Sequence, residues 1–252
     1  MPSGATCQTP AEVGGSSDSR LLGPTTGHSC GVDASDLLAL PLKLGSAIRR
    51  RRVFHPVGVM ARGSLERLAP PGEGLPVESS DVVARVSKGV GLPGALPDIA
   101  GLAVRIPPRP FAATPWDLLL ASAVARVVLL PVTSWSDVSL SSLMPLRHQD
   151  GYWWVGARLV TEIDDAGLSL DSIRRQISHG GVQFDLQQAC GRAPFQPLAR
   201  LSLSELAVGD ASHDVAFDPS IHSAPDVRLA PEWLTDLRRR AYQRSREGRA
   251  AD

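Results

Sequence analysis

The sequence contains no asparagine, only two lysines and only three cysteines among its 252 residues. The 26 basic side chains therefore comprise Lys43, Lys88 and 24 arginines, a usage typical of a GC-rich genome, so a single arginine carries little functional information. The absence of asparagine is more informative. It excludes every catalytic or binding site that depends on an asparagine carboxamide.

The chain also lacks net charge and a long apolar run. Its 26 acidic residues balance the 26 basic ones, so no whole-molecule field draws it to nucleic acid or to an anionic membrane. The most apolar stretch, residues 116–132, is interrupted by Arg126 and is too short for a comfortable bilayer span. No apolar run follows a basic start, so no secretory signal is expected. We expect a cytoplasmic protein without nucleic-acid or membrane partners.

The three cysteines, Cys7, Cys30 and Cys190, form no CxxC pair, no metal-binding spacing and no CxxCH haem attachment site. An odd number of cysteines without a secretory signal predicts reduced thiols in the cytoplasm. Cys190 is expected to be a small, semi-buried hydrophobic residue.

The composition changes along the chain. Residues 1–45 are rich in Gly, Ser, Thr and Pro and predict a flexible arm, whereas residues 46–252 predict one folded domain. In that domain, helical spacing occurs only at 170–178 and 231–246. Elsewhere the chain consists of short β-like runs separated by Gly and Pro. The predicted strands cover residues 53–65, 82–87, 102–106, 117–122, 138–147, 152–162, 182–188, 199–206 and 215–217.

Many short strands with few helices favour an α+β chain built on an antiparallel sheet. The dipeptide Asp150-Gly151 between two of the runs predicts a hairpin. Such a sheet is expected to close, or nearly close, into a barrel.

The first candidate site is the run RVFHPVGVMARG at residues 52–63. A histidine in a β-like run places its imidazole on one face of the sheet, and His55 shares that face with Val53 and Val57. A titratable ring among apolar side chains can move protons. The alternative is a hydrogen-bonded core histidine without a catalytic role.

The second candidate site is the terminal helix. Arg238 and Tyr242 lie four residues apart on one face, and Arg249 returns to within about 20° of Tyr242. Fixed positive charge beside a phenol favours the phenolate, which is a known axial ligand of haem iron. The alternative is a solvated basic helix in which the tyrosine has no such function.

Together these segments resemble the catalase family. Residues 52–63 resemble the catalase signature that carries the distal histidine, and Arg238 to Tyr242 resembles the ArgxxxTyr motif of the proximal haem ligand. Three further stretches resemble catalase segments in the same order along the chain. They are ARVS at 84–87, PDIAGLAVRI at 97–106 and WDL at 116–118.

The resemblance implies a catalase-like antiparallel β-barrel with few helices, no C-terminal helical domain and a ferric haem b. It implies that His55 is the distal acid–base catalyst and that Ser87 bonds the far nitrogen of that imidazole. It also implies that Tyr242 is the phenolate ligand and that Arg238 stabilises its charge. Arg52, Arg85 and Arg249 would pair with the haem propionates.

The sequence also departs from the family. Ala121 stands where catalases have the asparagine that orients peroxide, with Ser122 as the nearest hydroxyl, and Ala100 replaces the arginine of Asp-x-Arg-Gly. Loss of a polarising donor costs roughly a hundredfold or more in rate. The chain is also much shorter than a catalase. We therefore expect a peroxidase that uses hydrogen peroxide or an organic hydroperoxide and an electron donor, with weak or no catalase activity.

Three alternatives remain open. Catalase-like folds also rearrange fatty-acid hydroperoxides, as allene oxide synthases do. A haem protein for storage, transfer or sensing would need no turnover. Nucleic-acid binding through arginines 49–52 and the terminal arginines is the third. The chain could also form a homo-oligomer.

Overall fold

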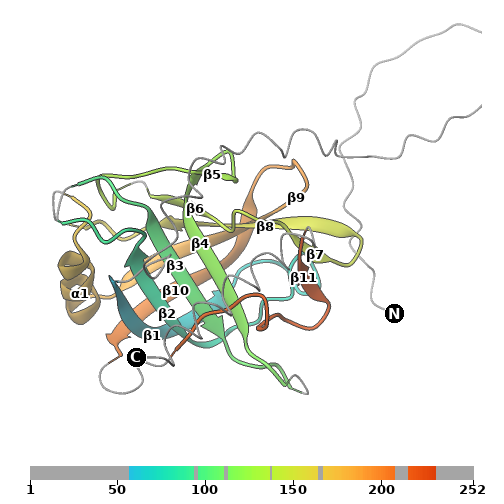
Figure 1. The fold of residues 1–252 in the computed structure, drawn as a ribbon. Helices are drawn as coiled ribbons and strands as arrows, with labels where there is room; N and C mark the ends of the chain where they lie inside the picture. Colours follow the sequence, from blue (N-terminus) through green and yellow to red (C-terminus); the bar gives the residue numbers. More distant parts are fainter. Residues whose placement is uncertain are drawn as a thin grey trace, which may run out of the picture. The chain divides into compact units, whose positions relative to one another are not determined.

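The computed structural model describes residues 57–93, 96–110, 113–136, 138–163, 167–207 and 215–230. The predicted arm at 1–45 and the predicted helix at 231–246 lie outside them. The described residues form one antiparallel sheet and one helix (Figure 1). The strands are β1 (Val57–Arg67), β2 (Ser80–Lys88), β3 (Ala100–Ile106), β4 (Trp116–Val124), β5 (Val128–Leu129), β6 (Ser139–Ser141), β7 (Leu146–His148), β8 (Gly151–Leu159), β9 (Val182–Cys190), β10 (Gln196–Leu206) and β11 (Val227–Leu229), and the helix is α1 (Leu170–His179).

Eight of the strands close into a barrel. The hydrogen-bonded order runs β8-β6-β4-β3-β2-β1-β10-β9, and β9 pairs again with β8. Closure leaves these strands without free edges that could template aggregation. The predicted α+β fold with an antiparallel barrel is therefore confirmed.

The barrel core follows from alternation along each strand. On β2, Val82, Ala84 and Val86 are buried, whereas Val83 and Arg85 between them are partly exposed. Directly paired residues on neighbouring strands share a face. The core therefore consists of rows of apolar side chains that cross several strands. One such row is Val59, Val86, Leu102 and Leu120, and the next is Ala61, Ala84, Val104 and Leu118.

Some predicted elements have different limits. The run 138–147 is two short strands, β6 and β7, separated by Leu143 in a left-handed conformation (φ 58°). The hairpin predicted at Asp150-Gly151 joins β7 to β8, with His148 paired to Gly151. Residues 215–217 are not a strand; the chain instead forms β11, which pairs with β7. The helix predicted at 170–178 is confirmed as α1.

Cys190, predicted to carry a reduced thiol, is disulfide-bonded in the structure. The prediction was wrong because it rested on an odd cysteine count, and an odd count does not prevent an individual cysteine from forming a disulfide.

Arg67 organises the loop between β1 and β2. Its guanidinium donates to the backbone carbonyls of five loop residues. A guanidinium has five N–H donors in a fixed fork, so this one side chain can hold a loop with no regular backbone pairing. The carbonyl oxygens belong to Ala69, Pro70, Glu73, Leu75 and Val77.

No helix within the described ranges is long and apolar enough to cross a membrane.

Candidate functional site

Two of the seven predicted site residues, Arg85 and Ser87, lie in the described part of the chain, both on β2. The structure brings them to the same face of the sheet, because they are two residues apart on one strand. The other five lie outside the described residues. They are Arg52, His55, Arg238, Tyr242 and Arg249.

Ser87 belongs to a row of small residues that crosses five strands. It pairs with Gly58 on β1 and Gly101 on β3; Gly101 pairs with Ala121 on β4, and Ala121 with Ser141 on β6. Since the core-facing positions are the alternate ones, this small-residue row faces away from the barrel core. Ser87, Ala121 and Ser141 are nevertheless buried.

A second row runs beside the first, one pleat away. Met60 pairs with Arg85, Arg85 with Ala103, and Ala103 with Leu119. Met60 is buried, and the other three residues are partly exposed. Arg85 is the only charged side chain in these two rows, which otherwise consist of small or apolar residues and two serines.

Two glycines of the RVFHPVGVMARG run are required by close contacts. A Cβ atom at Gly58 would lie 2.4 Å from Arg85 Nε, so glycine leaves the room that the arginine side chain occupies. A Cβ atom at Gly63 would lie 1.9 Å from the carbonyl oxygen of Ser202, at the bulge between β1 and β10. Gly58 lies on the face that Ser87 occupies, whereas Gly63 pairs with the core residue Val82, so the spacing of these glycines reflects sheet geometry.

Ser122 does not replace the missing asparagine. Its hydroxyl donates to the carbonyl of Leu130 (2.5 Å) and accepts from the amide of Ala100 (3.1 Å), and the residue is fully buried. It shares the core-facing side of β4 with Leu120, whereas Ala121 points the other way. Ala121, the position to which the sequence resemblance assigns the family's asparagine, carries only a methyl group.

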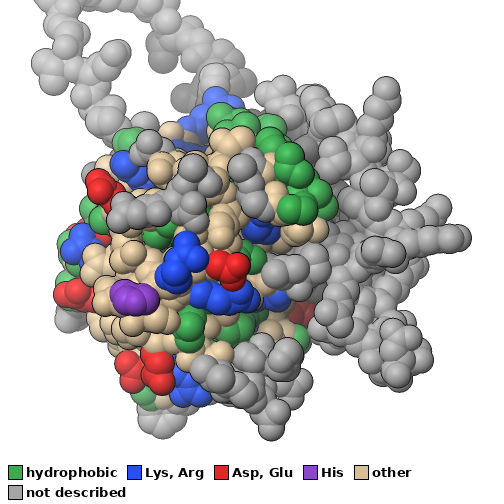
Figure 2. Space-filling model, turned by 90° about the vertical axis from the view of Figure 1, so that its left-hand side faces the viewer, with side chains coloured by type: hydrophobic (Ala, Val, Ile, Leu, Met, Phe, Trp, Pro, Cys, Tyr) green, Lys and Arg blue, Asp and Glu red, His purple; other side chains and the backbone are tan. Residues whose placement is uncertain are grey.

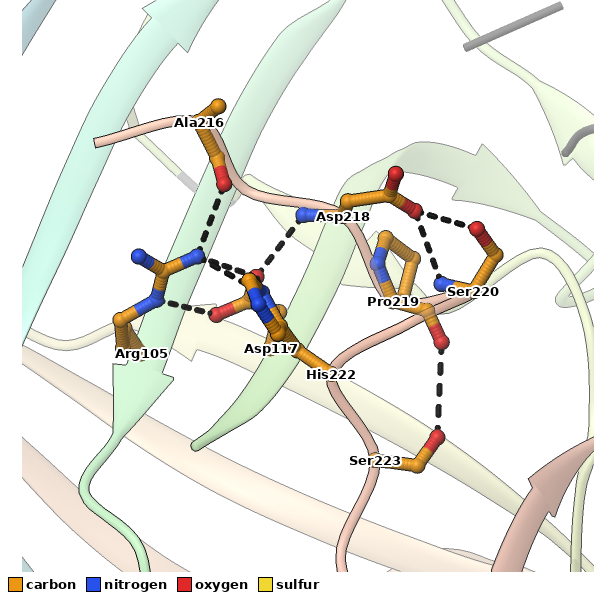
Figure 3. A network of polar contacts seen from close by, with 8 residues as sticks. All are labelled: Arg105, Asp117, Ala216, Asp218, Pro219, Ser220, His222 and Ser223. Carbon is orange, nitrogen blue, oxygen red and sulfur yellow. Dashed lines mark hydrogen bonds and ion pairs between the residues drawn. The ribbon is translucent and has the colours of Figure 1, made fainter. Parts of the chain in front are cut away.

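The start of β4 carries a polar network on the same face of the sheet as Ala121 (Figure 3). The buried carboxylate of Asp117 accepts two hydrogen bonds from Arg105 on β3, at 2.7 and 2.6 Å. It also accepts from the amide of Asp218 (2.8 Å) and from His222 Nδ1 (2.7 Å). Asp117 Oδ1 accepts one of these hydrogen bonds, and Oδ2 accepts the other three.

The network also determines the tautomer of His222. Arg105 Nη2 donates its two hydrogens to Asp117 and to the carbonyl of Ala216. It therefore has none left for His222 Nδ1, although the two atoms are 2.9 Å apart. Since a carboxylate only accepts, His222 must carry its proton on Nδ1 and donate it to Asp117. The network holds residues 216–222 against β3 and β4, on the face that carries the two rows.

Sequence reasoning quoted Asp117 only as part of a motif and did not select His222 or Asp218. One signal was available. A carboxylate between Trp116 and Leu118 in an apolar strand requires partners when it is buried, because an unpaired buried charge is costly.

A second buried carboxylate, Asp98, organises the loop between β2 and β3, next to Ser87 and Gly101. It accepts hydrogen bonds from four backbone amides, each at 2.8–2.9 Å. Burial raises the pKa of Asp98, but the four hydrogen bonds together lower it by more than burial raises it. The pKa of Asp98 therefore lies below its ordinary value. Lys88 Nζ donates to the Leu92 carbonyl in the same loop. The amides belong to Val90, Gly91, Leu92 and Ile99.

Two hollows lie elsewhere. A cleft of about 210 Å³ lies at the opposite ends of β2, β3 and β4, near Ser80, Ile106 and Trp116, and it shares no residue with the two rows. A smaller one lies beside α1. Within the described ranges, no group of three or more His, Cys, Asp and Glu side chains could hold a metal ion.

The described face has two features that suit the planar group implied by the sequence resemblance. Gly101 and Ala121 offer little side-chain volume, whereas the space at Gly58 is occupied by the Arg85 side chain. Arg85, between Met60 and Ala103 in the second row, carries a guanidinium, a group whose geometry suits a carboxylate. Ser87 supplies one buried hydroxyl.

Comparison with solved structures identifies the class of fold. Catalase A from Saccharomyces cerevisiae superposes with a TM-score of 0.52 at 11% identity, over 83% of this chain and 64% of the catalase chain. A fungal catalase matches with a TM-score of 0.54 at 11% identity (87% and 64%), and a bacterial catalase with 0.54 at 13% (82% and 59%). The protein therefore has a catalase-like fold.

This chain spans less than two thirds of the length of those catalases. No protein-family model matches the sequence, and no curated protein does.

Proposed function

We propose that this protein is a haem-dependent, peroxidase-like oxidoreductase that acts on hydrogen peroxide or organic hydroperoxides. The observation that carries the proposal is the small-residue row of the catalase-like barrel, in which Ser87 lies two positions from Ala121 across the sheet. The row keeps the hydroxyl that would orient a distal histidine and lacks the carboxamide that would orient peroxide.

When bound, the haem supplies the redox chemistry of peroxide reduction. His55 would take the proton of the hydroperoxide and return it, and Ser87 would hold the imidazole in one tautomer. Tyr242 would bind the iron as a phenolate, with Arg238 stabilising its negative charge. Three arginines would pair with the propionates: Arg52, Arg85 and Arg249.

The neighbours of Ala121 favour an organic hydroperoxide and disfavour catalase turnover. Without the carboxamide, the second half of dismutation loses a donor worth roughly a hundredfold or more in rate. Ala103 and Leu119, the partly exposed apolar residues of the adjacent row, present apolar surface to the same side of the sheet. An alkyl chain can lie on such a surface, and an external electron donor would complete the peroxidase cycle.

The same apolar surface is compatible with rearrangement of a fatty-acid hydroperoxide, which needs no reductant. Product analysis with a lipid hydroperoxide in the absence of reductant separates the two reactions. Ala121 is equally compatible with a haem carrier that does not turn over. A cytoplasmic location and a homo-oligomer remain predictions.

The haem ligand is tested by an absorption spectrum. Protein expressed with haem supplied is expected to show a five-coordinate, high-spin ferric phenolate spectrum. Tyr242→Phe removes the ligand oxygen and is expected to abolish that spectrum, whereas Tyr152→Phe, at an exposed tyrosine on β8, is expected to leave it unchanged. An unaltered spectrum in Tyr242→Phe would show that the ligand assignment is wrong.

The distal base is tested by turnover. His55→Ala is expected to lower peroxidase activity with an aromatic reductant by about a hundredfold or more, because no other group is proposed to move the proton. Haem affinity, measured by titration, is expected to persist because the ligand is Tyr242. Equal turnover in the variant and the natural protein would favour the haem carrier.

A further inference from the structure

Two loops at one end of the barrel expose an unusual number of aliphatic side chains. Val90 is 66% exposed and Val124 is 51% exposed, and five further Val and Leu side chains are exposed by more than a third. Figure 2 shows hydrophobic side chains gathered at the upper part of this side of the molecule. We call this set the apolar rim; it consists of Val90, Leu92, Leu96, Val124, Val127, Val128 and Leu130.

The two loops are joined at their base. The Asp98 amide donates to the Val132 carbonyl (3.0 Å), and the Val132 amide donates to the backbone carbonyl of Asp98 (2.8 Å). The Leu130 amide donates to the carbonyl of Ser122 (2.9 Å). The Asp98 carboxylate in turn holds the first loop through its hydrogen bonds to backbone amides. These hydrogen bonds tie the described parts of the two loops together at their base.

The hairpin between β4 and β5 holds its tip in a conformation that its residues disfavour. Ala125 (φ 49°) and Arg126 (φ 70°) are both left-handed, although turns of this kind favour Gly, Asn and Asp. Arg126 stabilises the tip by donating to the carbonyls of Gly191 and Ala193, each at 2.6 Å, and by stacking on Phe195. This arrangement projects Val124, Val127 and Val128 from the barrel.

The exposed charged side chains in the loops of the apolar rim have one sign. Residues 89–97 and 124–132 contain a single charged residue, Arg126, and no acidic residue. The adjoining turn, residues 191–195, adds the exposed Arg192 and no acidic residue. The carboxylate of Asp98 in the first loop is buried and bound to four backbone amides. A surface with aliphatic side chains, two arginines and no exposed carboxylate in its loops is complementary to anionic lipid headgroups over an apolar layer.

The size and composition of the apolar rim argue against a protein partner. It consists only of Val and Leu, whereas Trp, Tyr and Arg dominate the binding energy of protein interfaces. Its area is on the order of a few hundred Å², against about 800 Å² per partner in a stable complex. We propose that the apolar rim docks on the surface of an anionic lipid bilayer. The expectation of no membrane partner rested on net charge and the absence of a spanning segment, and neither describes a local surface.

The full-length protein is mixed with phosphatidylcholine vesicles with and without phosphatidylglycerol, and the fraction that floats with the vesicles is measured. We expect flotation that depends on phosphatidylglycerol and weakens with salt. The double variant Val124→Asp, Val128→Asp is expected to bind about tenfold less or weaker still, because two carboxylates must be desolvated. Since this measurement needs no haem, its failure and the failure of the proposed function are distinguishable.

The matched control is Ile221→Asp, which places a carboxylate on a side chain of similar exposure (48% against 49% for Val128) at the opposite end of β4. It is expected to float as the natural protein does. The milder double variant Val124→Ser, Val128→Ser covers the case in which aspartate prevents folding. The proposal is overturned if the natural protein does not float, if Ile221→Asp reduces flotation equally, or if the aspartate variant only dissociates a dimer.

Discussion

Replacing Asp117 by alanine is expected to lower the free energy of unfolding by about 3 kcal/mol, the lower end of the range for breaking a buried ion pair. In a barrel of this size that loss corresponds to a fall in melting temperature of roughly 10 °C. The Asp117 side chain is fully buried and accepts four hydrogen bonds, whereas its partners Arg105 and His222 are partly exposed. Because those partners regain some solvent, we expect the lower end of the range.

The loss has a local signature as well. The Asp218 amide donates to Asp117, and the Asp117 amide donates to the His222 carbonyl, so residues 216–222 depend on this carboxylate for their position. Hydrogen exchange at the Asp218 amide is therefore expected to accelerate more than exchange in β9 or β10. Asp117→Asn is expected to behave similarly, because its amide group would place a donor against donors.

The matched control is Asp185→Ala. Asp185 also pairs with an arginine, Arg200, at 3.0 Å, but both side chains are substantially exposed. Removing such a surface pair is expected to cost at most about 1 kcal/mol. If Asp117→Ala costs no more than Asp185→Ala, the network does not hold the segment as described.

The strands could be predicted because β-like runs bounded by Gly and Pro are typical of strands. The runs 82–87, 102–106 and 117–122 each lie within an observed strand; burial alternates along most of the first two, whereas 117–122 is buried except at Leu119. The alternation of side chains between the two faces of a strand could have placed Ser122. Ser122 is separated from Leu118 and Leu120 by even numbers of residues, so it faces the core as they do. Its nearness to Ala121 in the sequence did not indicate that the two side chains share a face.

Other features depend on contacts between distant parts of the chain. The strand β11 forms because Val227, Arg228 and Leu229 pair with β7, about 80 residues earlier, and nothing in this tripeptide predicts its partner. The bond between His222 and Asp117 spans 105 residues. In the candidate site, the two-residue spacing of Arg85 and Ser87 predicts that they share a face of the sheet. The row that joins Ser87 to Ala121 could not be predicted in this way, because it depends on the pairing register of three strands.

The second large effect concerns Asp98 and depends on pH. Asp98→Asn at neutral pH is expected to cost about 2–3 kcal/mol of unfolding free energy, because the amide keeps one oxygen and turns a donor toward backbone N–H groups. The amides of Gly91 and Leu92 both donate to Asp98 Oδ2 and compete directly with such a donor. Urea unfolding of both proteins measures the difference. Asp81→Asn, at an exposed position on β2, is the control and is expected to change stability little.

The sign of the pH effect follows from the lowered pKa of Asp98. In the unfolded chain an aspartate titrates near pH 4, so between that value and the lower folded pKa the unfolded state binds more protons. The stabilisation by Asp98 is therefore fully present above about pH 4 and is lost as the pH falls through the folded pKa. The difference in unfolding free energy between the natural protein and Asp98→Asn should be constant from neutral pH to about pH 5 and shrink below about pH 4. A difference that stays constant down to the lowest pH, or grows there, would contradict the assignment of Asp98 as an ionised carboxylate held by backbone amides.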